Sequence, residues 1–184
     1  LMTTHKGNCH SLPLFYKLLT EEIGEKSWLA LAPNHAYIKL QNQANGWYNV
    51  ELTSGQFPTD VWIKASRYIH TDAIRNGIYM DTLSLKSTIA VCMTDLAEGY
   101  KHKFAPDYDP EFILKCCNRT LEVFPNYMNA LLLKAETLFD IYTRTKREEY
   151  YQDAEILYSH IHQLGYRKMP EKMYTEWLQS LKKS

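Results

Sequence analysis

The chain has 184 residues, of which 45% are hydrophobic and 13% aromatic, a composition typical of one medium globular domain or two small ones and not of a disordered polypeptide. Its 21 basic and 21 acidic residues give a formal net charge of zero, so it lacks the basic footprint expected of a protein that binds nucleic acid or an anionic membrane. No apolar run reaches the roughly 18–20 residues that a membrane span needs.

The first predicted element is a helix over residues 9–23. Asn8 before it is a suitable N-cap, and Gly24 after it is suited to the left-handed position that ends many helices. Pro13 is easily accommodated only in a first turn, so we expect the regular helix to begin near Ser11 or Leu12. Apolar residues recur at helical spacing along it: Leu12, Phe15, Tyr16, Leu19 and Ile23.

Three strands are predicted next, over residues 27–32, 35–40 and 47–53, with a polar hairpin loop over 41–46. If the loop centres on Gln43, residues whose numbers sum to 86 face one another, and His35 pairs with Glu51. This register places the apolar residues of both strands on one face. The other face then carries His35, Tyr37, Trp47, Asn49 and Glu51.

The stretch Phe57–Asp60 is typical of a helix entry and is followed by an irregular segment to about Asp81. From Ser84 onward the apolar period is helical, which predicts helices over 84–104, 109–124, 126–145, 148–164 and 170–183. A weak internal echo at 42 residues favours stacked helical hairpins. The run Leu121–Ala135 resembles a junction of tetratricopeptide repeats, with a helix ending at a proline before the next helix opens.

The four cysteines match neither a disulfide framework nor a zinc knuckle. We expect Cys92, Cys116 and Cys117 to be buried small hydrophobes, because they lie in apolar helical patterns. Cys9 differs, since it lies at the start of a predicted helix. Unpaired N–H groups there are expected to lower the pKa of a thiol and to stabilise a tetrahedral oxyanion.

A thiol nucleophile needs a base, and the base needs an acceptor that orients it. The predicted hairpin supplies both in His35 and Glu51. Taken singly, each residue has a structural alternative: Cys9 as a half-buried thiol, His35 as a strand-capping histidine, and Glu51 as a solvated strand residue. A zinc site made by His5, Cys9 and His10 is a further alternative, which lacks a fourth ligand at a known spacing.

Three strings in this order resemble the transglutaminase-like superfamily, especially its bacterial branch: Gly-Asn-Cys-His-Ser-Leu at 7–12, Ala-Pro-Asn-His-Ala-Tyr-Ile at 32–38, and Gly-Trp-Tyr-Asn-Val-Glu-Leu-Thr-Ser-Gly at 46–55. The resemblance covers about residues 1–66. It implies that Cys9 is the nucleophile, His35 the general base and acid, and Glu51 the orienting residue. The family usually has Asp in place of Glu51, and some of its branches have lost the chemistry.

These observations predict an α+β fold, with a small antiparallel sheet packed on the cysteine-bearing helix, followed by an all-α repeat region. The expected domains are a transglutaminase-like module over 1–66, a connection over 67–83 and a tetratricopeptide-like region over 84–184. Because the chain begins at Leu1 and the family's usual core before the cysteine is missing, we expect an N-terminally trimmed fragment. The sequence does not indicate a compartment.

The predicted function is cysteine-dependent acyl chemistry on an amide bond of a peptide or protein, by hydrolysis or by transfer. Family resemblance favours hydrolysis. Asn8 and Asn34 are candidate hydrogen-bond donors beside the site, and Trp47, like Tyr37, is a candidate wall. No metal or organic cofactor is implied. The alternative function is a non-catalytic interaction module, in which the helical repeats bind a protein partner and the cysteine site is a relic.

Overall fold

The computed structural model describes residues 6–44, 46–173 and 175. The chain divides into two compact units. Leu1–Thr82 and Arg167–Ser184 form the first, called here the sheet unit, and Leu83–Tyr166 form the second, the helical unit. The fold class is α+β, as predicted, with one small antiparallel sheet of three strands in the order β1-β2-β3.

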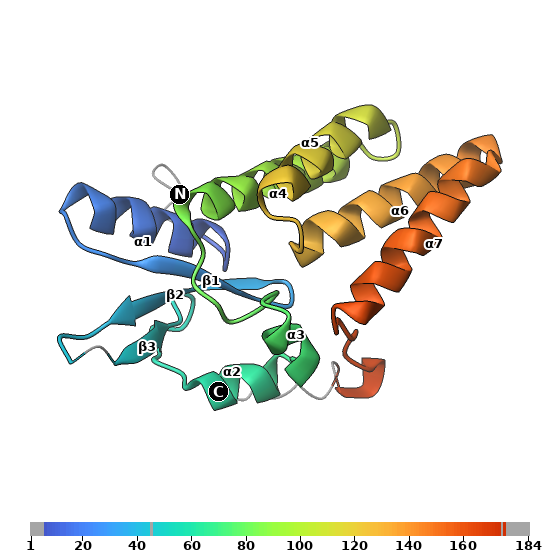
Figure 1. The fold of residues 1–184 in the computed structure, drawn as a ribbon. Coiled ribbons are helices and arrows are strands. Elements are labelled where there is room, and N and C mark those ends of the chain that lie inside the picture. Colours follow the sequence, from blue (N-terminus) through green and yellow to red (C-terminus); the bar gives the residue numbers. More distant parts are fainter. Residues whose placement is uncertain (1–5, 45, 174, 176–184) are drawn as a thin grey trace. The chain divides into compact units, whose positions relative to one another are not determined.

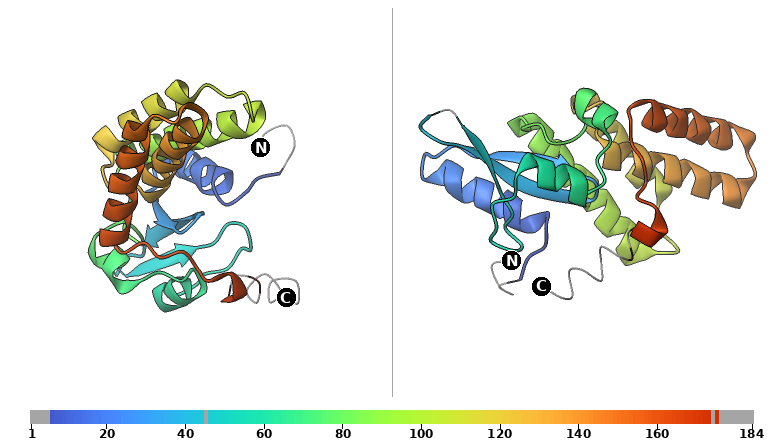
Figure 2. Two further views of the ribbon diagram at one scale, coloured as in Figure 1. Left: turned by 90° about the vertical axis from the view of Figure 1, so that its right-hand side faces the viewer. Right: turned by 90° about the horizontal axis from the view of Figure 1, so that it is seen from below.

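In the sheet unit the sheet lies between helix α1 and the α2–α3 segment (Figures 1 and 2). Helix α1 packs against β1 and β2. The elements are α1 Ser11–Glu22, β1 Trp28–Ala32, β2 His35–Gln41, β3 Trp47–Val50, α2 Asp60–Ser66 and α3 Thr71–Arg75. The predicted helix and three strands are thus confirmed, whereas α3 falls in the segment that was predicted to be irregular.

Helix α1 begins at Ser11, where Pro13 permits it, with Asn8 organising the turn before it. The Asn8 side-chain oxygen accepts hydrogen bonds from the N–H groups of His10 (3.1 Å) and Ser11 (2.9 Å). At the other end Gly24 adopts a φ of 79°, a left-handed conformation that glycine accommodates without strain. Both ends therefore follow the local sequence signals.

The buried face of α1 differs from the one predicted. Leu19 and Ile23 are 49% and 73% exposed, whereas Pro13, Lys17 and Thr20 are buried. Lys17 is buried because its ammonium donates to the Ser27 carbonyl at 3.0 Å and to the Glu21 carboxylate at 2.7 Å. These contacts compensate the charge of Lys17, so it can be buried on the face of α1 where the apolar pattern predicted Leu19.

The register of the β2–β3 hairpin is shifted from the predicted one by two residues. Ile38 pairs with Val50 and Lys39 with Asn49, so paired residue numbers sum to 88 and the pairing of His35 with Glu51 is wrong. The loop is organised by Asn42, whose N–H donates to the Gly46 carbonyl at 2.9 Å. Because a shift of two preserves the alternation of a strand, each residue keeps its predicted face.

The segment 67–82, nearly all of the predicted connection over 67–83, belongs to the sheet unit. The Met80 N–H donates to the Leu31 carbonyl at 2.9 Å, and Thr82 forms an isolated bridge with Ala30 of β1. Before it, Thr59 caps α2 by accepting from the Trp62 N–H at 3.2 Å, as the sequence of this helix entry predicted.

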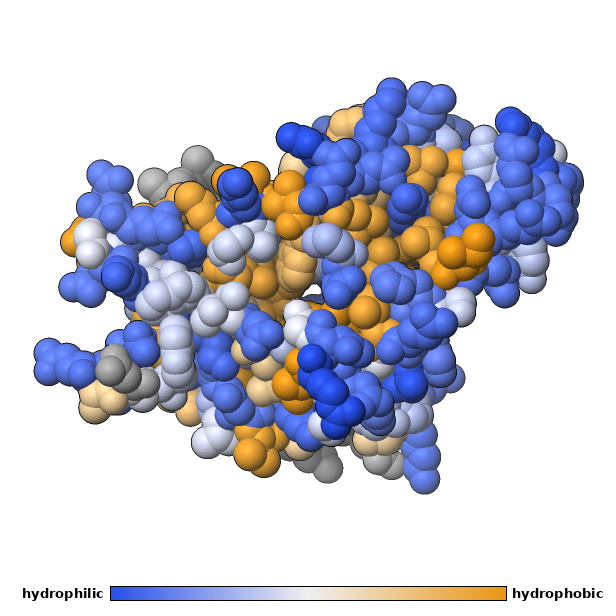
Figure 3. Space-filling view, viewed as in Figure 1, coloured by the Kyte–Doolittle hydropathy of each residue, from blue (hydrophilic) through white to orange (hydrophobic). Residues whose placement is uncertain are grey.

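The helical unit contains α4 Leu85–Phe104, α5 Pro110–Val123, α6 Met128–Thr145 and α7 Glu148–Gln163, close to the predicted ranges. Consecutive helices pack against each other, and α4 also contacts α6. The turn between α6 and α7 is polar and exposed (Figure 3). The predicted helix over 170–183 lies mostly outside the described residues, of which 171–173 and 175 are helical.

The core of this unit gathers around Ile113 and Cys117, which are fully buried, with Cys116 and Leu133 buried beside them. Cys92 is exposed, so its predicted burial is wrong: it lies on the outer side of α4. All four cysteines are free thiols. Among the described residues, none of the helices has the length and apolar character required to cross a membrane.

Candidate active site

His35 and Glu51 form a buried hydrogen-bonded pair. His35 is the first residue of β2, and Glu51 directly follows β3. The His35 Nε2 atom bonds to one oxygen of the Glu51 carboxylate. Both residues lie on the same face of the sheet, which explains how they meet although the register places them diagonally and not opposite each other. The other ring nitrogen, Nδ1, does not take part in this bond.

The Glu51 carboxylate is fixed through its other oxygen by Thr53. The N–H of Thr53 donates to Oε1 at 3.1 Å, and its hydroxyl donates to the same atom at 2.7 Å. Burial raises the pKa of Glu51, but the hydrogen bonds from His35 and Thr53 more than offset this and lower the pKa to about 2. Glu51 is therefore a carboxylate at neutral pH, with both oxygens engaged.

Cys9 lies against the strand start that carries His35. Its sulfur is half-buried and donates to the Asn34 carbonyl at 3.9 Å, and the N–H of Ala36 also faces it. The thiol thus contacts the backbone on both sides of His35. Two residues far apart in sequence are brought to one place because α1 packs on β1 and β2.

The electrostatics of Cys9 differ from the sequence-based expectation. Burial raises the pKa of the thiol above its ordinary value, and Glu51 adds to this. Arg67 and the N–H groups of Cys9 and Ala36 lower it, but by less. The predicted lowering is wrong in direction, because the regular helix begins two residues after Cys9 and the thiol is partly withdrawn from water.

Arg67 is a further charged residue at this site, and sequence reasoning missed it. It is the C-cap residue of α2, and its guanidinium interacts electrostatically with both Cys9 and Glu51. Burial lowers the pKa of Arg67, and the electrostatic interactions with Glu51 and Cys9 act in the opposite direction. No spacing in the sequence links α2 to the cysteine, so only the packing of α2 reveals this cation.

The other predicted site residues divide by position. Asn8 borders Cys9, but its side-chain oxygen acts as an acceptor for the helix start. Asn34 borders His35, and it is the backbone carbonyl that contacts the thiol. Trp47 lies opposite Gln41, at the other end of β2 from His35, and packs edge-on against Trp28 with ring centroids 5.0 Å apart. The structure therefore does not bring Trp47 to the site.

Tyr37 lies on the same face of β2 as His35, two residues further along. Its side chain is 1% exposed, and within the described residues its hydroxyl has no hydrogen-bond partner. The described residues contain no group of three or more His, Cys, Asp or Glu side chains placed to hold a metal. His5, a member of the alternative zinc site, lies outside the described residues.

Comparisons of the chain with protein-family models, with curated proteins and with solved structures find no match. The case for a function therefore depends on the geometry of Cys9, His35 and Glu51 and on the sequence strings that carry them.

Proposed function

We propose that the sheet unit is a transglutaminase-like module that carries out cysteine-dependent acyl chemistry on amide bonds of peptides or proteins. In this proposal Cys9 is the nucleophile, His35 the general base and acid, and Glu51 the orienting carboxylate. The observation that carries it is the buried His35–Glu51 hydrogen bond beside a half-buried thiol whose sulfur contacts the backbone flanking His35. A base with an orienting acceptor next to a thiol is the arrangement that nucleophilic catalysis requires.

The reaction follows from these roles. The Cys9 sulfur forms a bond to the amide carbon while His35 Nδ1 accepts the thiol proton. The carbon–nitrogen bond breaks, the leaving amine takes that proton from His35, and a thioester remains on Cys9. Water, deprotonated by His35, then attacks the thioester and releases the carboxylic acid and the free thiol. An amine in place of water gives transfer instead of hydrolysis.

The raised pKa of Cys9 assigns a specific part to His35. Because burial disfavours the thiolate, the resting thiol is protonated at neutral pH, and the proton has to move as the sulfur attacks. His35 then acts as a general base, in the manner of a serine–histidine pair. Arg67, near both Cys9 and Glu51, favours the negative charge that develops at the sulfur.

The test is acylation of Cys9 by p-nitrophenyl acetate, which transfers an acetyl group to sulfur and releases p-nitrophenolate. We expect a burst of about one equivalent in the wild type, with the acetyl group mapped to Cys9 by mass spectrometry. His35→Ala should slow this burst by about 10²–10⁴-fold, because general-base catalysis is lost. Cys9→Ser should abolish it.

Cys92 is the matched control inside the same chain, since it is a free thiol in an exposed residue. Partial desolvation of its sulfur raises its pKa, as at Cys9, and Asp95 adds to this. Cys92→Ser should leave the burst unchanged. The proposal fails if Cys92 is acetylated as fast as Cys9, or if Cys9 reacts equally fast in wild type and His35→Ala.

A second candidate function is supported by the surface of α4. Leu85, Ile89 and Leu96 are 59%, 55% and 59% exposed and recur with the exposed Cys92 at heptad-like spacing. This stripe matches the contact face of an amphipathic partner helix. In this proposal the helical unit binds a protein partner and Cys9 has no catalytic role. Sedimentation velocity measures association of the chain with such a partner. Loss of that association in Ile89→Asp, with no loss in Cys9→Ala, would support this function over the enzyme.

A further inference from the structure

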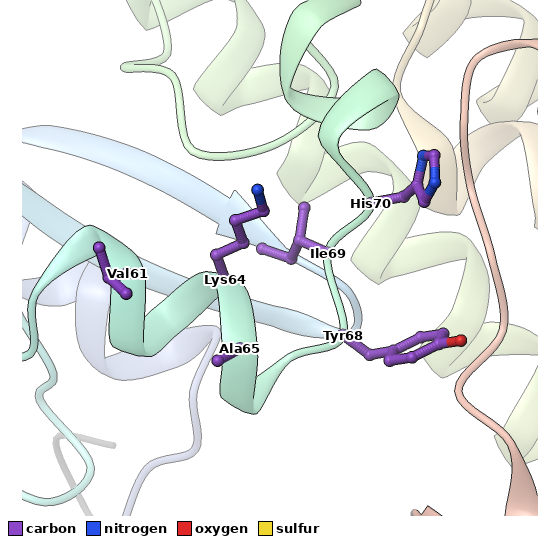
Figure 4. Close-up of a pocket in the computed structure, with 6 residues that line it drawn as sticks. All are labelled: Val61, Lys64, Ala65, Tyr68, Ile69 and His70. Carbon is purple, nitrogen blue, oxygen red and sulfur yellow. The ribbon is translucent and has the colours of Figure 1, made fainter.

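A pocket of about 340 Å³ opens on the sheet unit beside α2, and it is lined by Val61, Lys64, Ala65, Tyr68, Ile69 and His70 (Figure 4). Three of these residues come from α2 and three from the segment that leads to α3. Carbon atoms make up most of the lining, and the volume is at the lower end of the range for small-molecule sites. We call it the α2–α3 pocket.

Tyr68 in this pocket has a backbone conformation that tyrosine rarely adopts. It is the residue after the C-cap of α2, with a φ of 53°. Its N–H donates to the Ala65 carbonyl at 3.3 Å, and the next N–H, of Ile69, donates to the Lys64 carbonyl at 2.9 Å. This pair of backbone hydrogen bonds defines the Schellman motif, whose left-handed position favours glycine.

The same chain ends three other helices with this motif, and each has glycine at the left-handed position. They are Gly24 after α1, Gly77 after α3 and Gly165 after α7, with φ values of 79°, 66° and 92°. Only the helix beside the pocket has a bulky residue there among these four. A tyrosine at this position carries backbone strain that glycine would avoid, and strained residues cluster at ligand and active sites.

Lys64 supplies a positive charge to the same pocket. Its ammonium donates to the neutral Thr71 hydroxyl at 3.0 Å, and within the described residues it forms no ion pair with a carboxylate. His70 accepts the Asp72 N–H at its Nδ1 atom, which leaves Nε2 as the donor of the ring. The Asp72 carboxylate lies 3.3 Å from His70 Nδ1 and 3.2 Å from the Arg75 guanidinium, so it faces both side chains.

From the strained aromatic residue, the apolar lining and the cation, we propose that the α2–α3 pocket binds a small carboxylate with an aromatic or branched aliphatic body. The body lies against Ala65, Tyr68 and Ile69, and the carboxylate meets the Lys64 ammonium. This site is independent of the proposed acyl chemistry, because none of its lining residues belongs to the Cys9–His35–Glu51 set.

The experiment uses the full chain with Cys9→Ser, which cannot be acylated, and titrates 3-phenylpropionate by two-dimensional NMR. A ligand of this size binds with a dissociation constant of roughly 1 mM. The matched probe is 3-phenyl-1-propanol, which has the same body without the charge and should bind roughly tenfold more weakly. Shifts should be centred on residues 61–71.

Two variants separate the two halves of the site. Tyr68→Gly should melt at the wild-type temperature or above it, because glycine suits the left-handed position, and should weaken 3-phenylpropionate binding about tenfold. Lys64→Met should remove the preference for the carboxylate over the alcohol, whereas Lys86→Met, an exposed lysine on α4, should not. Equal binding of both probes to the wild type, or undiminished binding by Tyr68→Gly, would overturn the proposal.

Discussion

The two units bury polar side chains of different kinds. Among its described residues, the sheet unit buries two lysines, a histidine and a glutamate, Lys17, Lys39, His35 and Glu51, together with Asn49, Thr20 and Ser27. In the helical unit the buried polar residues other than tyrosine are threonines: Thr88, Thr94, Thr120 and Thr137. Three of these hydroxyls donate to main-chain carbonyls, as Thr137 does to Leu133 at 2.7 Å, and Thr94 donates to the Thr120 hydroxyl at 3.3 Å.

The difference separates a scaffold from a candidate site. A hydroxyl that bonds a carbonyl of its own helix, or of a helix packed against it, is satisfied once the helices form, so its burial costs little. A buried charge costs several kcal/mol unless its partners are well placed. Lys17 and Lys39 each bond a main-chain carbonyl and a more exposed carboxylate, and so tie segments of the fold together. His35 and Glu51 are both buried and ionisable, and such pairs gather at functional sites.

The largest stability effect is expected in the helical unit, where packing dominates. Ile113→Ala removes a fully buried side chain from the cluster with Cys117 and Leu133, and should lower the free energy of unfolding by about 2–5 kcal/mol. Urea denaturation measures it, with Ile156→Ala, at a 66% exposed position on α7, as the control. A loss below about 1 kcal/mol would mean that this core is loosely packed.

A smaller effect, specific to the sheet unit, is expected in acid. Glu51 has a pKa of about 2 in the folded protein against an ordinary value of 4.5, so its contribution to stability is complete above about pH 4.5. That contribution is lost as the pH falls from about 4.5 towards 2, because the unfolded chain takes up the proton first. We expect about 2 kcal/mol of acid-dependent stability from this carboxylate.

Glu51→Gln should remove this part of the acid dependence, measured as the difference between the unfolding free energies at about pH 7 and about pH 3. Glu25→Gln, which removes an exposed carboxyl group, is the matched control. If Glu51→Gln and wild type lose stability in parallel as the pH falls, the His35–Glu51 bond does not hold the carboxylate in its charged form.

Local signals in the sequence predicted most elements of the fold. Glycine after α1, threonine before α2 and the alternation of β2 and β3 each act within a few residues, so they are readable from the chain. The hairpin register was wrong by two residues because such a shift leaves every residue on its face. The candidate pair survived the error, since His35 and Glu51 share a face in either register.

What escaped prediction depends on contacts between distant segments. The burial of Lys17 needs the Ser27 carbonyl, and the proximity of Arg67 to Cys9 needs α2 to pack near the sheet. Neither of these two contacts leaves a periodic pattern in the amino-acid sequence. The apolar residues of α1 and α4 also gave a wrong prediction of the buried face. Helical spacing of leucines predicts burial, whereas Leu19 and Leu96 are exposed. Periodicity identifies a helix more reliably than it identifies the face that the helix buries.

The smallest effect tests whether the helical unit depends on specific polar bonds at all. Thr120 on α5 donates to the Ala90 carbonyl of α4 at 3.2 Å and accepts from Thr94 at 3.3 Å. Thr120→Val keeps the shape and should lower the free energy of unfolding by only about 1 kcal/mol, because the Thr94 hydroxyl and the Ala90 carbonyl keep each other as partners. Thr143→Val, on the exposed end of α6, should change it by less than about 0.5 kcal/mol in the same urea titration. A loss of more than about 2 kcal/mol at Thr120 would show that the two units do not differ in kind, since a neutral hydroxyl network would then be as critical to the helices as the His35–Glu51 hydrogen bond is to the sheet.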